Sequence, residues 1–112
     1  MNQQDLVWVR LPFSDFSESK VRPALIVSNN KYNRNSKDVV VCAVTSNLAQ
    51  SEYSVIIDAK NLSSGTLPLK SAIKADKILQ IEKQLAIRPF GKLDDKTFDS
   101  VTRKLSDLVK RA

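Results

Sequence analysis

The chain has 112 residues and a formal net charge of +6, and 42% of its residues are hydrophobic while 27% are charged. This length supports one hydrophobic core, so we expect a single domain over residues 1–112. The chain has no histidine and one cysteine, Cys42, which excludes histidine-based catalytic triads and metal sites rich in histidine or cysteine. We therefore expect no metal and no cofactor.

The sequence is basic, with a pI near 9.6, which permits nucleic-acid binding without requiring it. No apolar run is long enough to cross a bilayer, and residues 1–5 lack the basic and apolar layout of a signal peptide. We therefore expect a cytoplasmic protein with no membrane contact. Cys42 lies in the apolar run 39–44, so we expect it to be a small buried hydrophobe.

The first half of the chain predicts four strands, over residues 5–11, 22–28, 39–45 and 53–58. The third is almost entirely apolar, which is typical of a central strand. Residues 12–19 combine turn-forming residues with two aromatic side chains and predict a mobile loop. Residues 29–36 are polar and predict a turn-rich segment with one short helical turn.

The second half predicts strands over residues 67–75 and 77–81 after a turn at 63–65, and an extended segment over 86–90 before a turn at Gly91. From Asp94 onward, the apolar residues recur at spacings of three and four, which predicts an amphipathic helix capped by Asp94 or Asp95. Short strands followed by one helix indicate a mainly β fold, a small, strongly bent antiparallel barrel with a C-terminal amphipathic helix.

The segment around Arg22 is the most informative part of the sequence. Pro23 forces Arg22 into extended geometry, and proline suits the first residue of a strand. A guanidinium held at the mouth of a strand can give two hydrogen bonds to a phosphate. The alternative interpretation is a surface arginine at a strand start.

Two further polar segments adjoin apolar strands. Thr45, Ser46 and Asn47 follow the third predicted strand, and residues 70–76 carry Lys70, Ser71, Lys74 and Asp76. In an extended segment, Lys70, Lys74 and Asp76 would share one face. A cation and an acid on one face could act in acid–base chemistry or orient a phosphate. The alternatives are a solvated face with a weak ion pair and hydroxyls that merely terminate a strand.

The order of these segments resembles the PemK/MazF family of toxin endoribonucleases over nearly the whole chain. The matching segments are Gln4-Asp5-Leu6-Val7, Arg22-Pro23-Ala24-Leu25-Ile26-Val27-Ser28, Tyr32-Asn33, Ala43-Val44-Thr45-Ser46, Lys70-Ser71 with Asp76, and Phe90-Gly91-Lys92-Leu93. The resemblance implies an SH3-like barrel with a C-terminal helix, present as a homodimer.

The resemblance also implies a toxin of a type II toxin–antitoxin system that cleaves single-stranded RNA at short sequences without a metal. The ribose 2′-hydroxyl attacks its own phosphate and leaves a 2′,3′-cyclic phosphate and a 5′-hydroxyl. By position, the resemblance implies that the catalytic residues are Arg22, Thr45, Lys74 and Asp76. We expect the RNA-binding residues to be Lys20, Ser46, Asn47, Lys70 and Ser71.

The implied partners are single-stranded RNA and an acidic antitoxin encoded nearby, with any DNA contact made only through the toxin–antitoxin complex. The chain departs from the family pattern at Gln4, which replaces a glycine, and at Ala43, Lys74 and Lys77; these departures bear on the rate and on the cleavage sequence. The alternative function is a non-catalytic member that binds nucleic acid or a partner protein. An SH3-like module for proline-rich ligands is disfavoured, because Trp8 lies in an apolar strand and aromatic residues are few.

Overall fold

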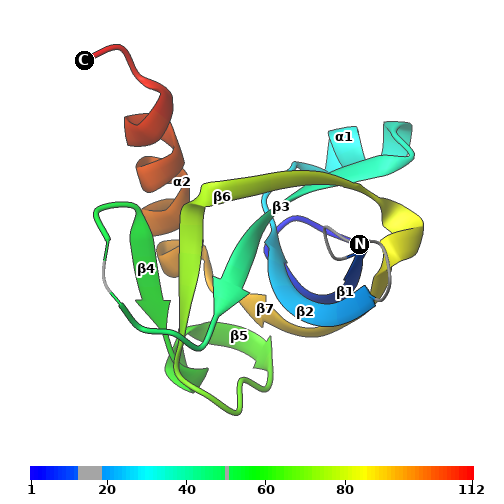
Figure 1. Cartoon of the computed structure of the whole chain (residues 1–112), viewed down its shortest axis with the longest axis horizontal. Coiled ribbons are helices and arrows are strands. Elements are labelled where there is room, and N and C mark those ends of the chain that lie inside the picture. The colour runs from blue at the N-terminus through cyan, green and yellow to red at the C-terminus, as the bar shows by residue number, and fades with distance from the viewer. Residues whose placement is uncertain (13–18, 50) are drawn as a thin grey trace.

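The computed structural model describes residues 1–12, 19–49 and 51–112, and these residues form one antiparallel sheet with a C-terminal helix. The loop predicted over residues 12–19 lies mostly outside the described residues. In Figure 1 the sheet curls round on itself and the C-terminal helix lies against one side of it. The predicted mainly β fold, a bent antiparallel sheet followed by a helix, is confirmed.

The strands of the described residues are β1 (Asp5–Pro12), β2 (Ser19–Ile26), β3 (Asp38–Thr45), β4 (Ser54–Ile57), β5 (Leu62–Gly65), β6 (Ser71–Glu82) and β7 (Ala86–Leu93). Their order across the sheet is β4-β6-β3-β2-β1-β7-β5. As predicted, the apolar strand β3 lies inside the sheet, between β6 and β2. The helices are α1 (Asn30–Asn35) and α2 (Asp95–Val109), with short 3-10 turns at Ala59–Asn61 and Lys83–Leu85.

The buried side chains form two clusters on opposite faces of the sheet. The inner cluster consists of Val7, Val9, Ala24, Ile26, Val39, Val41 and Ile81. The helix-side cluster consists of Leu6, Leu25, Cys42, Val44, Ile57, Ile73, Leu93, Phe98 and Val101. This division follows from the period of two along a strand, which sends neighbouring residues to opposite faces.

Helix α2 closes the helix-side cluster, because Phe98 and Val101 are buried in it and Leu105 packs against it. Asp94, rather than Asp95, is the N-cap, since its carboxylate accepts a hydrogen bond from the Thr97 backbone N–H at 2.8 Å. Hydrogen bonds from the Thr97 side chain and backbone lower the pKa of Asp94. The predicted amphipathic helix is therefore confirmed together with its cap.

Cys42 is buried, as predicted. Burial, reinforced by the negative charge of Asp76, raises the pKa of the Cys42 thiol to about 11. At neutral pH the group is thus a protonated, unreactive thiol, and it contributes packing to the helix-side cluster.

The turns predicted at residues 63–65 and at Gly91 are wrong, because both segments are strand. Gly65 pairs with Gly91 across β5 and β7. Gly65 has a φ of 83°, and a Cβ atom on it would lie 2.4 Å from the Cα atom of Gly91. Gly65 is therefore required by the close approach of two backbones within a sheet, and a Cβ atom on Gly91 would lie 2.8 Å from Leu62 Cδ2. A sequence cannot distinguish such a close approach from a turn.

Pro23 is not the first residue of a strand, since β2 begins at Ser19 and Pro23 pairs with Trp8 of β1. Proline is tolerated there because β2 pairs with β3 only from Ala24 onward. Its missing N–H therefore removes no hydrogen bond to β3. The consequence of Pro23 for Arg22 is as predicted, because Arg22 lies in extended backbone within β2.

Gln4 has a φ of 79°, in the left-handed region that favours glycine. This is the position at which the resemblance gives glycine. The strain, roughly 1–2 kcal/mol for a residue with a side chain, is offset by side-chain hydrogen bonds. The Gln4 Nε2 group donates to the Leu93 carbonyl oxygen at 2.9 Å and to Asp95 Oδ1 at 3.0 Å, so this departure ties β1 to the start of α2.

Candidate functional site

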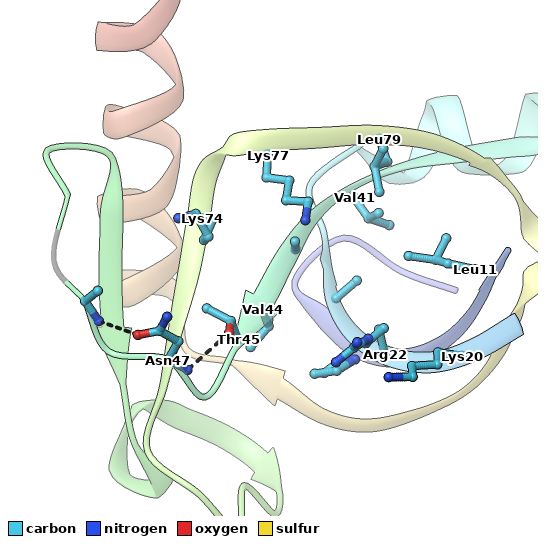
Figure 2. A pocket seen from close by; sticks show the side chains of 14 residues that line it. Leu11, Lys20, Arg22, Val41, Val44, Thr45, Asn47, Lys74, Lys77 and Leu79 are labelled. Atoms are coloured by element: carbon cyan, nitrogen blue, oxygen red, sulfur yellow. Dashed lines mark hydrogen bonds between the residues drawn. The ribbon is translucent and has the colours of Figure 1, made fainter. Parts of the chain in front are cut away.

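A cavity of about 590 Å³ opens beside the inner cluster, between β2, β3 and β6. This volume falls in the range of ligand pockets, roughly 300–1,000 Å³. Four cationic side chains line it, Lys20 and Arg22 from β2 and Lys74 and Lys77 from β6. Figure 2 shows these side chains around the cavity, with Thr45 and Asn47 at the end of β3. The lining thus combines an apolar floor with a cationic rim.

The period of two explains how β2 and β3 build this cavity. Along β2, Ile26 and Ala24 are buried in the inner cluster, and Arg22 continues the same face into the cavity. Along β3, Val41 is followed by Ala43 and Thr45 in the same way. Each strand therefore changes from buried apolar residues to polar residues on one face, which places the functional groups where the core ends.

Strand β6 completes the wall, but with an irregularity. Ile81 packs in the inner cluster and Leu79 packs against it, and Lys77 continues that face into the cavity. Residues 75–77 of β6 form a bulge, because Cys42 pairs with Ile78 whereas the next residue of β3, Ala43, pairs with Lys74. The bulge changes which residues face inward, so Lys74 also lines the cavity.

Of Lys70, Lys74 and Asp76, which would share one face of a regular strand, only Lys74 lines the cavity. Lys70 precedes β6 and is exposed, and Asp76 lies in the bulge and is exposed. Neither residue lines the cavity. The negative charge of Asp76 contributes to the raised pKa of Cys42, so its carboxylate lies near that thiol. The alternation of a regular strand does not hold here, because residues 75–77 of β6 have no partner on β3.

The end of β3 is held by local hydrogen bonds. Thr45 Oγ1 accepts from the Asn47 backbone N–H at 3.1 Å, and Asn47 Oδ1 accepts from the Ala49 backbone N–H at 3.0 Å (Figure 2). Accepting this bond leaves the hydroxyl hydrogen of Thr45 able to donate to a ligand. The turn therefore fixes an oxygen-bound donor at the rim.

A second, smaller hollow of about 200 Å³ shares Arg22 and Thr45 with the main cavity. Ser46 and Ser71, both expected to bind RNA, line this hollow rather than the main cavity. Ser71 is buried, and its hydroxyl donates to the Leu69 carbonyl oxygen at 2.9 Å. The hollow also contains Trp8 and Phe90, whose ring centroids are 4.8 Å apart.

The cavity is electrically unbalanced. In the part of the chain that the structure describes, Arg22, Lys74 and Lys77 form no ion pair, and no carboxylate lines the cavity. No group of histidine, cysteine, aspartate or glutamate side chains among residues 1–12, 19–49 and 51–112 is suited to hold a metal. Such a site attracts anions.

Lys77 is a site residue that the sequence reasoning missed, since it was treated only as a departure from the family pattern. The alternation of Ile81, Leu79 and Lys77 was a signal that could have found it.

Of the described helices, none is long and apolar enough to cross a membrane.

A protein-family model for the PemK-like, MazF-like toxins of type II toxin–antitoxin systems matches residues 2–109. The chain belongs to this family. A search of curated protein sequences gave no significant match.

Solved structures of toxins share the fold. A MazE–MazF structure from Deinococcus radiodurans (form III) has a TM-score of 0.82 at 20% identity, covering 100% of this chain and 98% of that chain. An endoribonuclease in complex with its cognate antitoxin from a mycobacterial species has a TM-score of 0.79 at 21% identity, covering 100% and 99%. The Mycobacterium tuberculosis toxin MazF-mt6 has a TM-score of 0.75 at 20% identity, covering 92% and 93%. At these identities the likeness concerns the fold.

Proposed function

We propose that this chain is the toxin of a type II toxin–antitoxin pair and an endoribonuclease that cleaves single-stranded RNA without a metal. The observation that carries the proposal is the cationic cavity, whose rim presents Arg22, Thr45 and Lys74, in a chain that belongs to a toxin family. The family match and the fold do not favour the non-catalytic alternative.

The reaction suits a cavity that offers cations and a hydroxyl. The 2′-oxygen of the ribose forms a bond to the adjacent phosphorus while the bond from phosphorus to the 5′-oxygen breaks. Solvent water takes the proton of the 2′-hydroxyl and the 5′-oxygen gains a proton, so the products are a 2′,3′-cyclic phosphate and a 5′-hydroxyl. The protein supplies no nucleophile and must stabilise the negative charge that gathers on the phosphorane oxygens.

The roles follow from position. The Arg22 guanidinium donates two hydrogen bonds to the phosphorane oxygens, and the Thr45 hydroxyl donates a third. Lys74, on the opposite wall, protonates the departing 5′-oxygen. Asp76, which the resemblance places among the catalytic residues, lies outside the cavity, so the proposal gives its carboxylate no contact with the reacting atoms. Lys20 and Asn47 bind the RNA on either side of the reacting phosphate, and Ser46 and Ser71 bind it in the adjoining hollow.

We propose that the protein acts in the cytoplasm. We also propose that the active form is a homodimer, because one short barrel offers little concave surface for an RNA strand. Light scattering should give about twice the 12.5 kDa mass of one chain at micromolar concentration. A mass of one chain throughout that range would contradict the dimer.

The inhibitor we propose is an acidic, flexible antitoxin segment that folds on the cavity and replaces the phosphates of RNA with carboxylates. Endoribonuclease–antitoxin complexes are known for proteins of this fold. The small protein encoded beside this one should bind and inhibit it, and binding should weaken as salt rises. A neighbour that neither binds nor inhibits would contradict the inhibitor model alone.

The function is tested by incubating the protein with a mixed single-stranded RNA in excess chelator and analysing the new ends. We expect cleavage that leaves 2′,3′-cyclic phosphate and 5′-hydroxyl ends. Intact RNA, or 5′-phosphate ends, would overturn the proposal.

A further inference from the structure

Lys77 extends from β6 into the cavity, on the far side of β3 from Arg22 (Figure 2). Its position is set by the strand, because Ile81 and Leu79 anchor the same face of β6 in and against the inner cluster. The side chain of Lys77 is therefore directed into the cavity by packing, and it is not a free surface lysine of arbitrary direction.

The surroundings of Lys77 favour an anionic ligand. Its exposed ammonium forms no ion pair within the described residues. Lys74 lines the same wall, so the two positive charges repel each other. The cavity floor beside them is apolar, with Leu11, Val41 and Leu79, and a low-dielectric wall strengthens the attraction of an ammonium for a phosphate.

We propose that Lys77 binds a backbone phosphate of the RNA next to the phosphate at Arg22. This inference rests on the proposed function and extends it to a residue outside the family pattern. Arg22 and Lys77 come from strands that are separated by β3, two strand spacings or roughly 10 Å apart. The two cations therefore lie on different walls of the cavity and can each contact a different phosphate, and a lysine serves the second phosphate as a compact charge with three donors.

The contact is with the sugar–phosphate backbone, so it contributes to affinity and to its salt dependence, equally for all sequences. Each phosphate neutralised on a single strand adds about 0.7 to the slope of log K against log salt concentration. Lys77 should therefore contribute about that much to the slope, and the order of preference among RNA sequences should be independent of it.

The test measures binding of the full chain to a single-stranded RNA whose 2′-hydroxyl at the cleaved position is replaced by hydrogen, across a range of salt concentrations. We expect K77Q to bind more weakly at low salt, with a slope reduced by about 0.7, and K77R to retain the wild-type slope. The matched control is K31Q, since Lys31 is an exposed lysine of α1 that does not line the cavity. Thermal unfolding of K77Q should match that of the wild type, because the ammonium forms no ion pair with the residues that the structure describes.

A K77Q protein that keeps the wild-type slope, while the wild type binds and cleaves RNA, would overturn this inference alone. A slope lowered equally in K31Q would also overturn it, because the effect would then reflect net charge. A wild type that neither binds nor cleaves RNA would overturn the proposed function, and this inference with it.

Discussion

Arg22 and Thr45 occupy facing positions at the point where β2 and β3 separate. The two strands pair at Ala24 with Ala43, Leu25 with Cys42 and Ile26 with Val41. The same register continued by two residues sets Arg22 opposite Thr45, and both line the main cavity and the smaller hollow. Two buried strands that pair and then diverge thus present a guanidinium and a hydroxyl to the same ligand.

Replacing Arg22 by alanine should lower the cleavage rate by roughly a hundredfold to a thousandfold, because one charge-stabilising donor is lost. The cleavage rate of Arg22→Lys should lie between those of the wild type and Arg22→Ala, since an ammonium cannot give the paired hydrogen bonds of a guanidinium. The measurement is the single-turnover cleavage rate of one RNA. Arg34→Ala, an exposed arginine of α1, is the control. Near-normal cleavage by folded Arg22→Ala would remove Arg22 from the reaction.

Replacing Ala43 by leucine should block RNA binding while the fold persists. Ala43 lines the cavity and pairs with Ala24 on one side and Lys74 on the other. A larger side chain there would fill space that the phosphates and bases need. We expect at least a tenfold loss of affinity, about 1.4 kcal/mol, with Ala43→Ser as a small control. Unchanged binding by folded Ala43→Leu would show that RNA does not enter the cavity.

Replacing Asp76 by asparagine should change the cleavage rate by no more than roughly twofold, as for a surface substitution. The reason is that Asp76 lies in the β6 bulge and does not line the cavity. Comparison with Lys74→Gln, two residues away and inside the cavity, separates the two positions. A large loss in Asp76→Asn would show that the carboxylate reaches the reacting atoms.

Asp94 should make stability depend on pH through the cap of α2. Its pKa is lowered by hydrogen bonds from Thr97. The ionised cap therefore stabilises the fold fully above the ordinary carboxyl pKa of 3.8, and this stabilisation is lost as the pH falls through the lowered pKa. Asp94→Ala should lower the free energy of unfolding by about 1 kcal/mol at pH 7. Urea denaturation should show a smaller difference between the wild type and Asp94→Ala at low pH than at pH 7. Asp94→Asn should retain a cap that does not titrate. A constant difference at all pH values would contradict the cap.

Much of the fold is predictable from the sequence because its signals are local. The apolar run of β3 indicates a strand covered on both faces, and the spacing from Phe98 to Leu105 indicates a helix with one buried face. The two predicted strands over 67–75 and 77–81 are instead the single strand β6, which begins at Ser71. Asp76 and Lys77 interrupt the apolar pattern there and suggest a break, whereas the chain continues through a bulge.

The site is predictable where a regular strand carries one face from the buried core into the cavity. Arg22 and Thr45 follow from apolar residues two positions away, and the structure brings their side chains to one cavity with Lys20, Asn47 and Lys74. The bulge in β6 is set by pairing with β3 and by the bond from the Ala75 N–H to the Tyr53 carbonyl oxygen at 2.9 Å. These are contacts between distant segments, so the position of Lys74 in the cavity and of Asp76 outside it could not be predicted from their spacing.

If the cavity cleaves RNA by attack of the ribose 2′-hydroxyl, removal of that one hydroxyl should abolish cleavage. The wild-type protein is incubated, in excess chelator, with two strands of identical sequence. One is all ribose, and the other carries a single 2′-deoxy nucleotide on the 5′ side of the cleaved bond. We expect cleavage of the first strand, with a 2′,3′-cyclic phosphate end, and an intact second strand. Cleavage of both strands at that bond would exclude attack by the 2′-hydroxyl.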